Sequence, residues 1–166
     1  MHISILTTGG TIEKKYNETD GSLRNVGSIL DQVILHLRLP GVMTRHVPVM
    51  SKDSLDMNDE DRMHILVAVK RALHDSDAVI VIHGTDTLAV TGELLHASLP
   101  DLNKPVILTG AMRPFEFRDT DAYQNLTEAL LACKLVGSGV WVVLHNEVLR
   151  FPGVVKDRQR MTFVKT

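Results

Sequence analysis

The sequence has one cysteine, no long apolar run and almost no net charge. A single thiol, Cys133, cannot form an internal disulfide, and its neighbours Leu130, Leu131 and Ala132 predict a small buried side chain on a helix. No segment approaches the roughly 20 apolar residues of a membrane span, and the first six residues contain no basic stretch before an apolar one. We therefore expect a soluble, cytoplasmic protein with no membrane partner.

The charges are balanced, because eighteen Lys and Arg residues stand against twenty Asp and Glu residues and leave a net charge of −2. Such a balance provides no positive surface for nucleic acid or for anionic lipid. A small molecule is the partner that this composition favours, and no nucleic-acid partner is expected.

Motifs for metal and nucleotide binding are also missing. The eight histidines include no His-Glu-x-x-His and no comparable ligand spacing, which makes zinc coordination the weaker interpretation. Neither the phosphate loop Gly-x-x-x-x-Gly-Lys-Ser/Thr nor a Gly-x-Gly-x-x-Gly turn at the start of a helix occurs. We predict no metal and no cofactor.

Short apolar runs alternate with helical patterns along the 166 residues, which is enough chain for one core and one domain, residues 1–166. The alternation predicts a flavodoxin-like, doubly wound, mostly parallel α/β sheet with strand order 2-1-3-4-5. The predicted strands are residues 3–6, 42–50, 78–82, 105–109 and 140–144, and the predicted helices are residues 28–39, 56–74, 87–99 and 119–136.

Two of these strands are each followed by a short loop rich in threonine and glycine, residues 8–11 (TGGT) and 83–87 (HGTDT). The carboxyl ends of parallel strands meet at one edge of a sheet, so both loops should face one small molecule. A threonine hydroxyl becomes a nucleophile when a base takes its proton, and Gly9 and Gly10 leave backbone N–H groups free as donors. The spacing of these glycines and threonines does not by itself decide between an acyl-transfer site, an ordinary turn and a phosphate-binding loop.

Four segments together resemble the bacterial-type L-asparaginases, the asparaginase/glutaminase family. Residues 7–12 (TTGGTI) and 83–87 (HGTDT) are similar to its two signature segments. Residues 108–114 (LTGAMRP) and 54–59 (SLDMND) are similar to its Gly-Ala-Met-Arg-Pro segment and to its substrate-binding Ser-Gln-Asp-Met loop. Residues 146–149 followed by 154–157 also resemble the C-terminal hairpin that carries the family's catalytic lysine, which is Lys156 here.

The resemblance implies a role for each matching position. The implied catalytic residues are Thr11 as nucleophile, Tyr16 as its activator when the following loop closes, and Thr85, Asp86 and Lys156 as a proton-transfer set. The implied substrate-binding residues are Gly10, Ser54, Leu55, Thr85 and Asp86, with Leu55 standing where the family has glutamine. His83 is expected to orient its loop through its ring. No metal is required.

The implied reaction converts L-asparagine and water to L-aspartate and ammonia through a threonine acyl-enzyme. The alternatives are a broader glutaminase-asparaginase, a non-catalytic amino-acid-binding module, or an amidase subunit of an amidotransferase that acts on aminoacyl-tRNA. Typical family members have a second domain whose acidic residue completes a neighbouring subunit's site. Since these residues leave room for one domain, we expect a homo-oligomer in which a second copy supplies that carboxylate.

Overall fold

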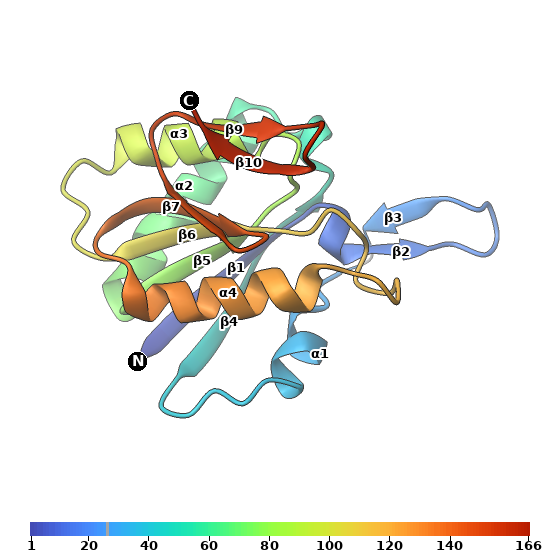
Figure 1. Cartoon of the computed structure of the whole chain (residues 1–166), viewed down its shortest axis with the longest axis horizontal. Helices are drawn as coiled ribbons and strands as arrows, with labels where there is room; N and C mark the ends of the chain where they lie inside the picture. The colour runs from blue at the N-terminus through green and yellow to red at the C-terminus, as the bar shows by residue number, and fades with distance from the viewer. Residues whose placement is uncertain (26) are drawn as a thin grey trace.

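A computed structural model describes residues 1–25 and 27–166 and has a twisted central sheet (Figure 1). Its six strands follow the order β4-β1-β5-β6-β7-β8, and all neighbours are parallel except β7 and β8. The predicted order 2-1-3-4-5 is therefore confirmed, with one antiparallel strand added at the edge. The strands are β1 (His2–Gly9), β4 (Met43–Lys52), β5 (Ala78–Ile82), β6 (Pro105–Thr109), β7 (Gly139–Leu144) and β8 (Glu147–Arg150).

Helices cover both faces of the sheet, as expected of a doubly wound fold. On one face α1 (Leu30–Leu35) and α4 (Ala122–Leu135) pack on side chains such as Ile80 and Ile82. On the other face α2 (Asp59–Asp75) and α3 (Leu88–Ser98) pack on Val79 and Val81. Successive side chains of a strand point to opposite faces, so a strand buried on both faces is apolar throughout, and every residue of β5 and β6 is buried.

All four predicted helices were too long: 87–99 and 119–136 are helical over Leu88–Ser98 and Ala122–Leu135, and the other two differ for identifiable reasons. The helix predicted over 56–74 begins at Asp59, three residues later than predicted, because Ser54–Asp56 forms the short 3-10 helix η2. The side chain of Asn58 then accepts a hydrogen bond from Asp61 N, and that of Asp61 accepts one from Asn58 N, so a capping box starts α2. The segment 28–39 is helical over Leu30–Leu35 only, and Pro40 accounts only for the non-helical geometry of Leu39, the residue before it.

The lysine-bearing hairpin differs from the predicted one in its first arm. Residues 146–149 lie in and just before β8, which pairs with β7 rather than with the lysine strand. His145 and Asn146 connect β7 and β8 with φ angles of 55° and 62°, the left-handed geometry of a tight hairpin turn. Lys156 lies on β9 (Val154–Asp157), which pairs with β10 (Thr162–Lys165), so the expected C-terminal hairpin is present as β9–β10.

Another small hairpin lies in the polar stretch for which no strand was predicted. The 3-10 helix η1 (Thr11–Glu13) leads into β2 (Lys14–Tyr16), which pairs with β3 (Leu23–Asn25). Figure 1 shows this β2–β3 hairpin projecting from the body of the molecule.

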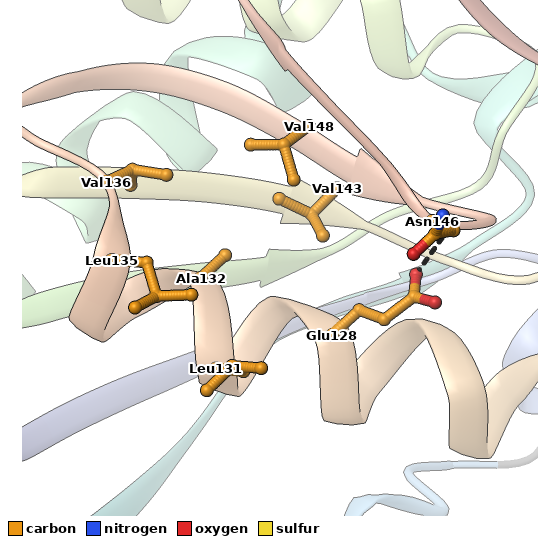
Figure 2. A pocket seen from close by; sticks show the side chains of 8 residues that line it. All are labelled: Glu128, Leu131, Ala132, Leu135, Val136, Val143, Asn146 and Val148. Carbon is orange, nitrogen blue, oxygen red and sulfur yellow. Dashed lines mark hydrogen bonds between the residues drawn. The ribbon is translucent and has the colours of Figure 1, made fainter.

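An apolar hollow of about 150 Å³ lies between α4 and the β7–β8 hairpin (Figure 2). Leu131, Leu135 and Val148 contribute to its lining, and Glu128 accepts a hydrogen bond from Asn146 N at its end. It contains none of the residues predicted to be functional.

Cys133 is buried on α4 as predicted, and burial raises the pKa of its thiol to about 12. In the described part of the chain no helix is both long enough and apolar enough to cross a bilayer.

We predict that Gly92→Ala destabilises the protein. A Cβ atom at this position of α3 would lie 2.1 Å from the ring of Phe151, which is buried in the core. Overpacking of this kind costs about 1–3 kcal/mol, against about 1 kcal/mol gained from the helix propensity of alanine. Urea unfolding should therefore show a lower free energy of unfolding. Gly137→Ala is the matched control, because a Cβ there meets nothing within 4 Å. Equal stabilities of the two variants would show that the Phe151 ring is not tightly held.

Candidate active site

The two threonine loops meet at the carboxyl ends of β1 and β5. These strands are parallel neighbours, with Thr7 opposite Ile82, so both chains leave the sheet at the same edge. The backbones then come so close that a Cβ on Gly10 would lie 2.4 Å from the Cα of Gly84. Gly10 also has a φ of +85°, which favours glycine. We call this region, with the loops that follow β1 and β5, the site edge.

The loop of η2 brings Ser54 to the site edge. A Cβ on Gly84 would lie 2.6 Å from Ser54 Oγ, and Thr87 Oγ1 donates a hydrogen bond to Ser54 O at 2.8 Å. Ser54 is 1% exposed, and its hydroxyl has no hydrogen-bond partner within residues 1–25 and 27–166. A buried hydroxyl without a partner is costly, so this one is available to a bound polar group. The next residue, Leu55, exposes 66% of its surface beside it.

Lys156 reaches the site edge from β9. Its Nζ donates hydrogen bonds to Thr85 Oγ1 at 2.8 Å and to Asp86 Oδ1 at 2.9 Å. The guanidinium of Arg158 lies 3.6 Å from the same oxygen of Asp86. We call Thr85, Asp86, Lys156 and Arg158 the lysine cluster. The contact between Lys156 and Thr85 has the length that direct proton transfer between them requires.

His83 is buried behind the lysine cluster. Its Nδ1 lies 2.8 Å from Gly84 O and its Nε2 lies 2.9 Å from Thr91 Oγ1. Burial lowers the pKa of this ring to about 4. A neutral ring that donates from Nδ1 to Gly84 O can accept from the Thr91 hydroxyl, so both ring nitrogens are paired. This geometry supports the expected role of His83 in orienting its loop.

The segment 108–114 lies next to the His83 loop, since a Cβ on Gly110 would be 2.3 Å from His83 O. Asp121 holds this segment by accepting hydrogen bonds from Met112 N at 2.9 Å and Arg113 N at 3.0 Å. Burial acts to raise the pKa of Asp121, but these hydrogen bonds and one from His145 keep it below its usual range.

Asp121 and its partners were missed by sequence reasoning. His145 Nε2 lies 2.7 Å from Asp121 Oδ2, and Asn125 donates to Asp121 and to Gly110 O. Asp121 is the residue before α4, but its side chain makes no capping hydrogen bond to that helix, so a helix-cap signal in the sequence would not have revealed its contacts with Met112 and Arg113. His145 carried no such signal, because the fold alone brings the end of β7 against α4.

Tyr16 is not brought to the lysine cluster. It ends β2 on the projecting hairpin, is 56% exposed, and its hydroxyl lies beside Gly21 on the same hairpin. Thr11 lies at the start of η1, directly after Gly10, and is half-buried. The structure therefore places Thr11 at the site edge and Tyr16 outside it.

An ion pair ties the start of the hairpin to the Ser54 loop. Lys14 Nζ lies 2.5 Å from Asp53 Oδ2. Partial burial acts to raise the pKa of Asp53, but the hydrogen bonds from Lys14 and from Leu55 N hold it below its usual range. In the described residues, no three His, Cys, Asp or Glu side chains come together as metal ligands.

Comparisons with known proteins show what the chain is similar to. A family model described as Asparaginase, N-terminal, matches residues 2–162. L-asparaginase 1 of Escherichia coli (strain K12) is 34% identical over 154 residues, which are 89% of this chain and 45% of that protein. A glutamyl-tRNA(Gln) amidotransferase polypeptide of Metallosphaera sedula is 32% identical over 148 residues, covering 87% of this chain and 34% of that protein.

Solved structures show the same likeness. The thermostable L-asparaginase from Thermococcus kodakarensis superimposes with a TM-score of 0.90 at 30% identity, covering 99% of this chain and 51% of that one. A probable cytoplasmic L-asparaginase from Campylobacter jejuni has a TM-score of 0.79 at 27% identity. The chain thus spans about half the length of the asparaginases it matches. With nearly all of its residues matched by the N-terminal domain model, the chain belongs to the asparaginase family.

Proposed function

We propose that this protein hydrolyses the side-chain amide of L-asparagine to L-aspartate and ammonia through a threonine acyl-enzyme. One observation carries the proposal: Lys156 Nζ donates hydrogen bonds to both Thr85 and Asp86. These two residues directly follow Gly84, whose backbone contacts that of Gly10. An amine, a hydroxyl and a carboxylate thus lie beside the loop that bears Thr11, and their proximity supports a proton-transfer role for Lys156. The membership of the chain in the asparaginase family supports the same reaction.

In the first half of the reaction, Thr11 Oγ attacks the side-chain carbonyl carbon and loses its proton. Tyr16 would help to remove that proton after the β2–β3 hairpin has closed over the site. Backbone N–H groups of the glycine turn are the donors available to the developing oxyanion. The amide nitrogen takes up a proton and leaves as ammonia, and a β-aspartyl ester on Thr11 remains.

In the second half, water attacks the ester carbonyl and releases L-aspartate. Thr85 is the group that contacts the water, and Lys156 exchanges protons with Thr85 at the hydrogen bond described above. The Thr11 hydroxyl is regenerated when the ester bond breaks. Ser54 binds the α-carboxylate of the substrate, and Asp86 binds its α-nitrogen.

The amidotransferase alternative has support of its own, since a polypeptide of a glutamyl-tRNA(Gln) amidotransferase is among the relatives. Ammonia release by the purified chain alone favours a free-standing amidohydrolase. Release only in the presence of a partner protein and aminoacyl-tRNA would favour the alternative. Self-association and location in the cytoplasm stay predictions.

We predict that Thr11→Ala, Thr85→Val and Lys156→Met each remove nearly all asparagine hydrolysis. Loss of a nucleophile or of a proton-transfer group costs at least the ~10²–10⁴-fold typical of acid–base catalysis. A coupled ammonia assay measures the rate, and circular dichroism checks that each variant is folded. Thr127→Val and Lys134→Met are matched controls, because both side chains lie exposed on α4. Normal turnover in either threonine variant would contradict the role given to that threonine.

We also predict a preference for L-asparagine over L-glutamine. With the α-substituents held by Ser54 and Asp86, one more methylene moves the amide carbon by more than about 1 Å from Thr11, and such misplacement costs on the order of 10²-fold. The two values of kcat/KM in the same assay test this. Equal values would show that the α-substituents are not anchored where we place them.

A further inference from the structure

The short helix η1, which begins at Thr11, is held at both of its ends by the same short segment. Before η1, Gly10 N donates a hydrogen bond to Lys52 O at 2.8 Å. After η1, Lys14 Nζ lies 2.5 Å from Asp53 Oδ2. Lys52 ends β4 and Asp53 is the next residue, so two adjacent residues fix the start and the end of the turn that bears Thr11.

The segment that receives these two contacts is itself anchored. Lys52 Nζ donates to both carboxylate oxygens of Asp61, at 2.7 and 2.8 Å, and Asp61 belongs to the capping box that starts α2. The other oxygen of Asp53, Oδ1, accepts a hydrogen bond from Leu55 N at 3.0 Å and so caps η2, the turn that carries Ser54. The Asp53 carboxylate therefore connects η2 directly to the residue that follows η1.

The ion pair is the contact at η1 that depends on side-chain chemistry, because the one before η1 joins two backbones. Lys14 is the first residue of β2, so it lies where η1 passes into the projecting β2–β3 hairpin (Figure 1). The two side chains are 22% and 27% exposed, and water screens them less than a fully exposed pair. Tyr16 N also donates to Glu116 Oε1 at 2.6 Å, so loss of the ion pair should loosen η1 without releasing the hairpin.

We propose that the Lys14–Asp53 ion pair fixes the distance between Thr11 and Ser54 and thereby makes the site selective for asparagine. In the proposed function Ser54 binds the α-carboxylate and Thr11 attacks the side-chain amide, so this distance must match the length of the substrate. Glutamine is longer by one methylene, and a fixed distance disfavours it. Lys14 and Asp53 are positioning residues that act through Thr11 and Ser54. The inference rests on the proposed amide hydrolysis.

Lys14→Met removes the ion pair and tests the proposal in the ammonia assay. For L-asparagine kcat/KM should fall about three- to fivefold, the effect of one partly buried ion pair, and chiefly through kcat. For L-glutamine it should change less than about twofold, because the fixed distance does not align its amide carbon. The asparagine-to-glutamine ratio therefore falls. Lys14→Arg keeps the charge and should keep most of the ratio. An equal fall for both substrates, as expected of a contact that only stabilises the fold, would overturn the proposal.

Asp53→Asn tests the other partner without removing the cap of η2. Its amide oxygen can still accept from Leu55 N, but its NH2 group does not attract an ammonium. It should reproduce the effect of Lys14→Met, and the double variant should be no worse than either, because both changes remove one interaction. Lys15→Met is the matched control, since Lys15 is exposed on β2 and successive side chains of a strand point to opposite sides. It should leave both values of kcat/KM unchanged.

Hydrogen exchange separates this inference from the proposed function. The amides of Glu13 and Lys14 are hydrogen-bonded within η1. They should exchange about two- to fivefold faster in Lys14→Met and Asp53→Asn, and at the unaltered rate in Lys15→Met. If neither substrate releases ammonia, the proposed hydrolysis fails, and the exchange rates decide whether the ion pair fixes η1. If ammonia is released but Lys14→Met changes neither the ratio nor the exchange rates, the hydrolysis stands and this inference is wrong.

Discussion

The close contact between the Gly10 and Gly84 backbones is the constraint on which the site depends. Two parallel strands, β1 and β5, leave the sheet side by side, and any side chain at either glycine would push the loops apart. A Cβ on Gly84 would also collide with Ser54 Oγ, so the same glycine admits the Ser54 loop. Three loops can therefore share one edge of the sheet because two residues have no side chain.

The position of Lys156 depends on packing at some distance from the threonines. The β9–β10 hairpin is held to α3 by a hydrogen bond of 2.6 Å from Gly153 N to Glu93 Oε1 and by the ring of Phe151 against Gly92. Phe163, which is paired with Lys156 across the hairpin, is buried in the same core. Ordinary core packing thus positions Lys156 next to Thr85, and the chemistry that we propose there depends on the stability of the hairpin.

The residues proposed for the two halves of the mechanism differ in how closely they lie together in this structure. Thr85, Asp86 and Lys156 are joined by hydrogen bonds and rest on strands and a packed hairpin. Tyr16 lies on a two-stranded hairpin that projects from the body, and such hairpins are marginally stable alone. The ion pair of Lys14 with Asp53 links the base of that hairpin to the Ser54 loop. Movement of the hairpin would thus act on the Ser54 loop, for which we propose binding of the α-carboxylate.

The sequence by itself determined the fold class, because buried parallel strands are uniformly apolar and alternate with helical patterns, and the order 2-1-3-4-5 is one that this class commonly adopts. It also predicted which loops meet at the site edge, since a glycine- and threonine-rich segment after a buried strand can be recognised in the sequence. It did not determine the pairing of residues 146–149 with β7, which depends on a left-handed turn at His145 and Asn146. Nor could it place Asp121 beside His145 or Lys14 beside Asp53, because these contacts join segments far apart in the chain. Only the tertiary structure, in which packing sets the distance between charges, showed that both ends of η1 are held by the segment that leads into the Ser54 loop.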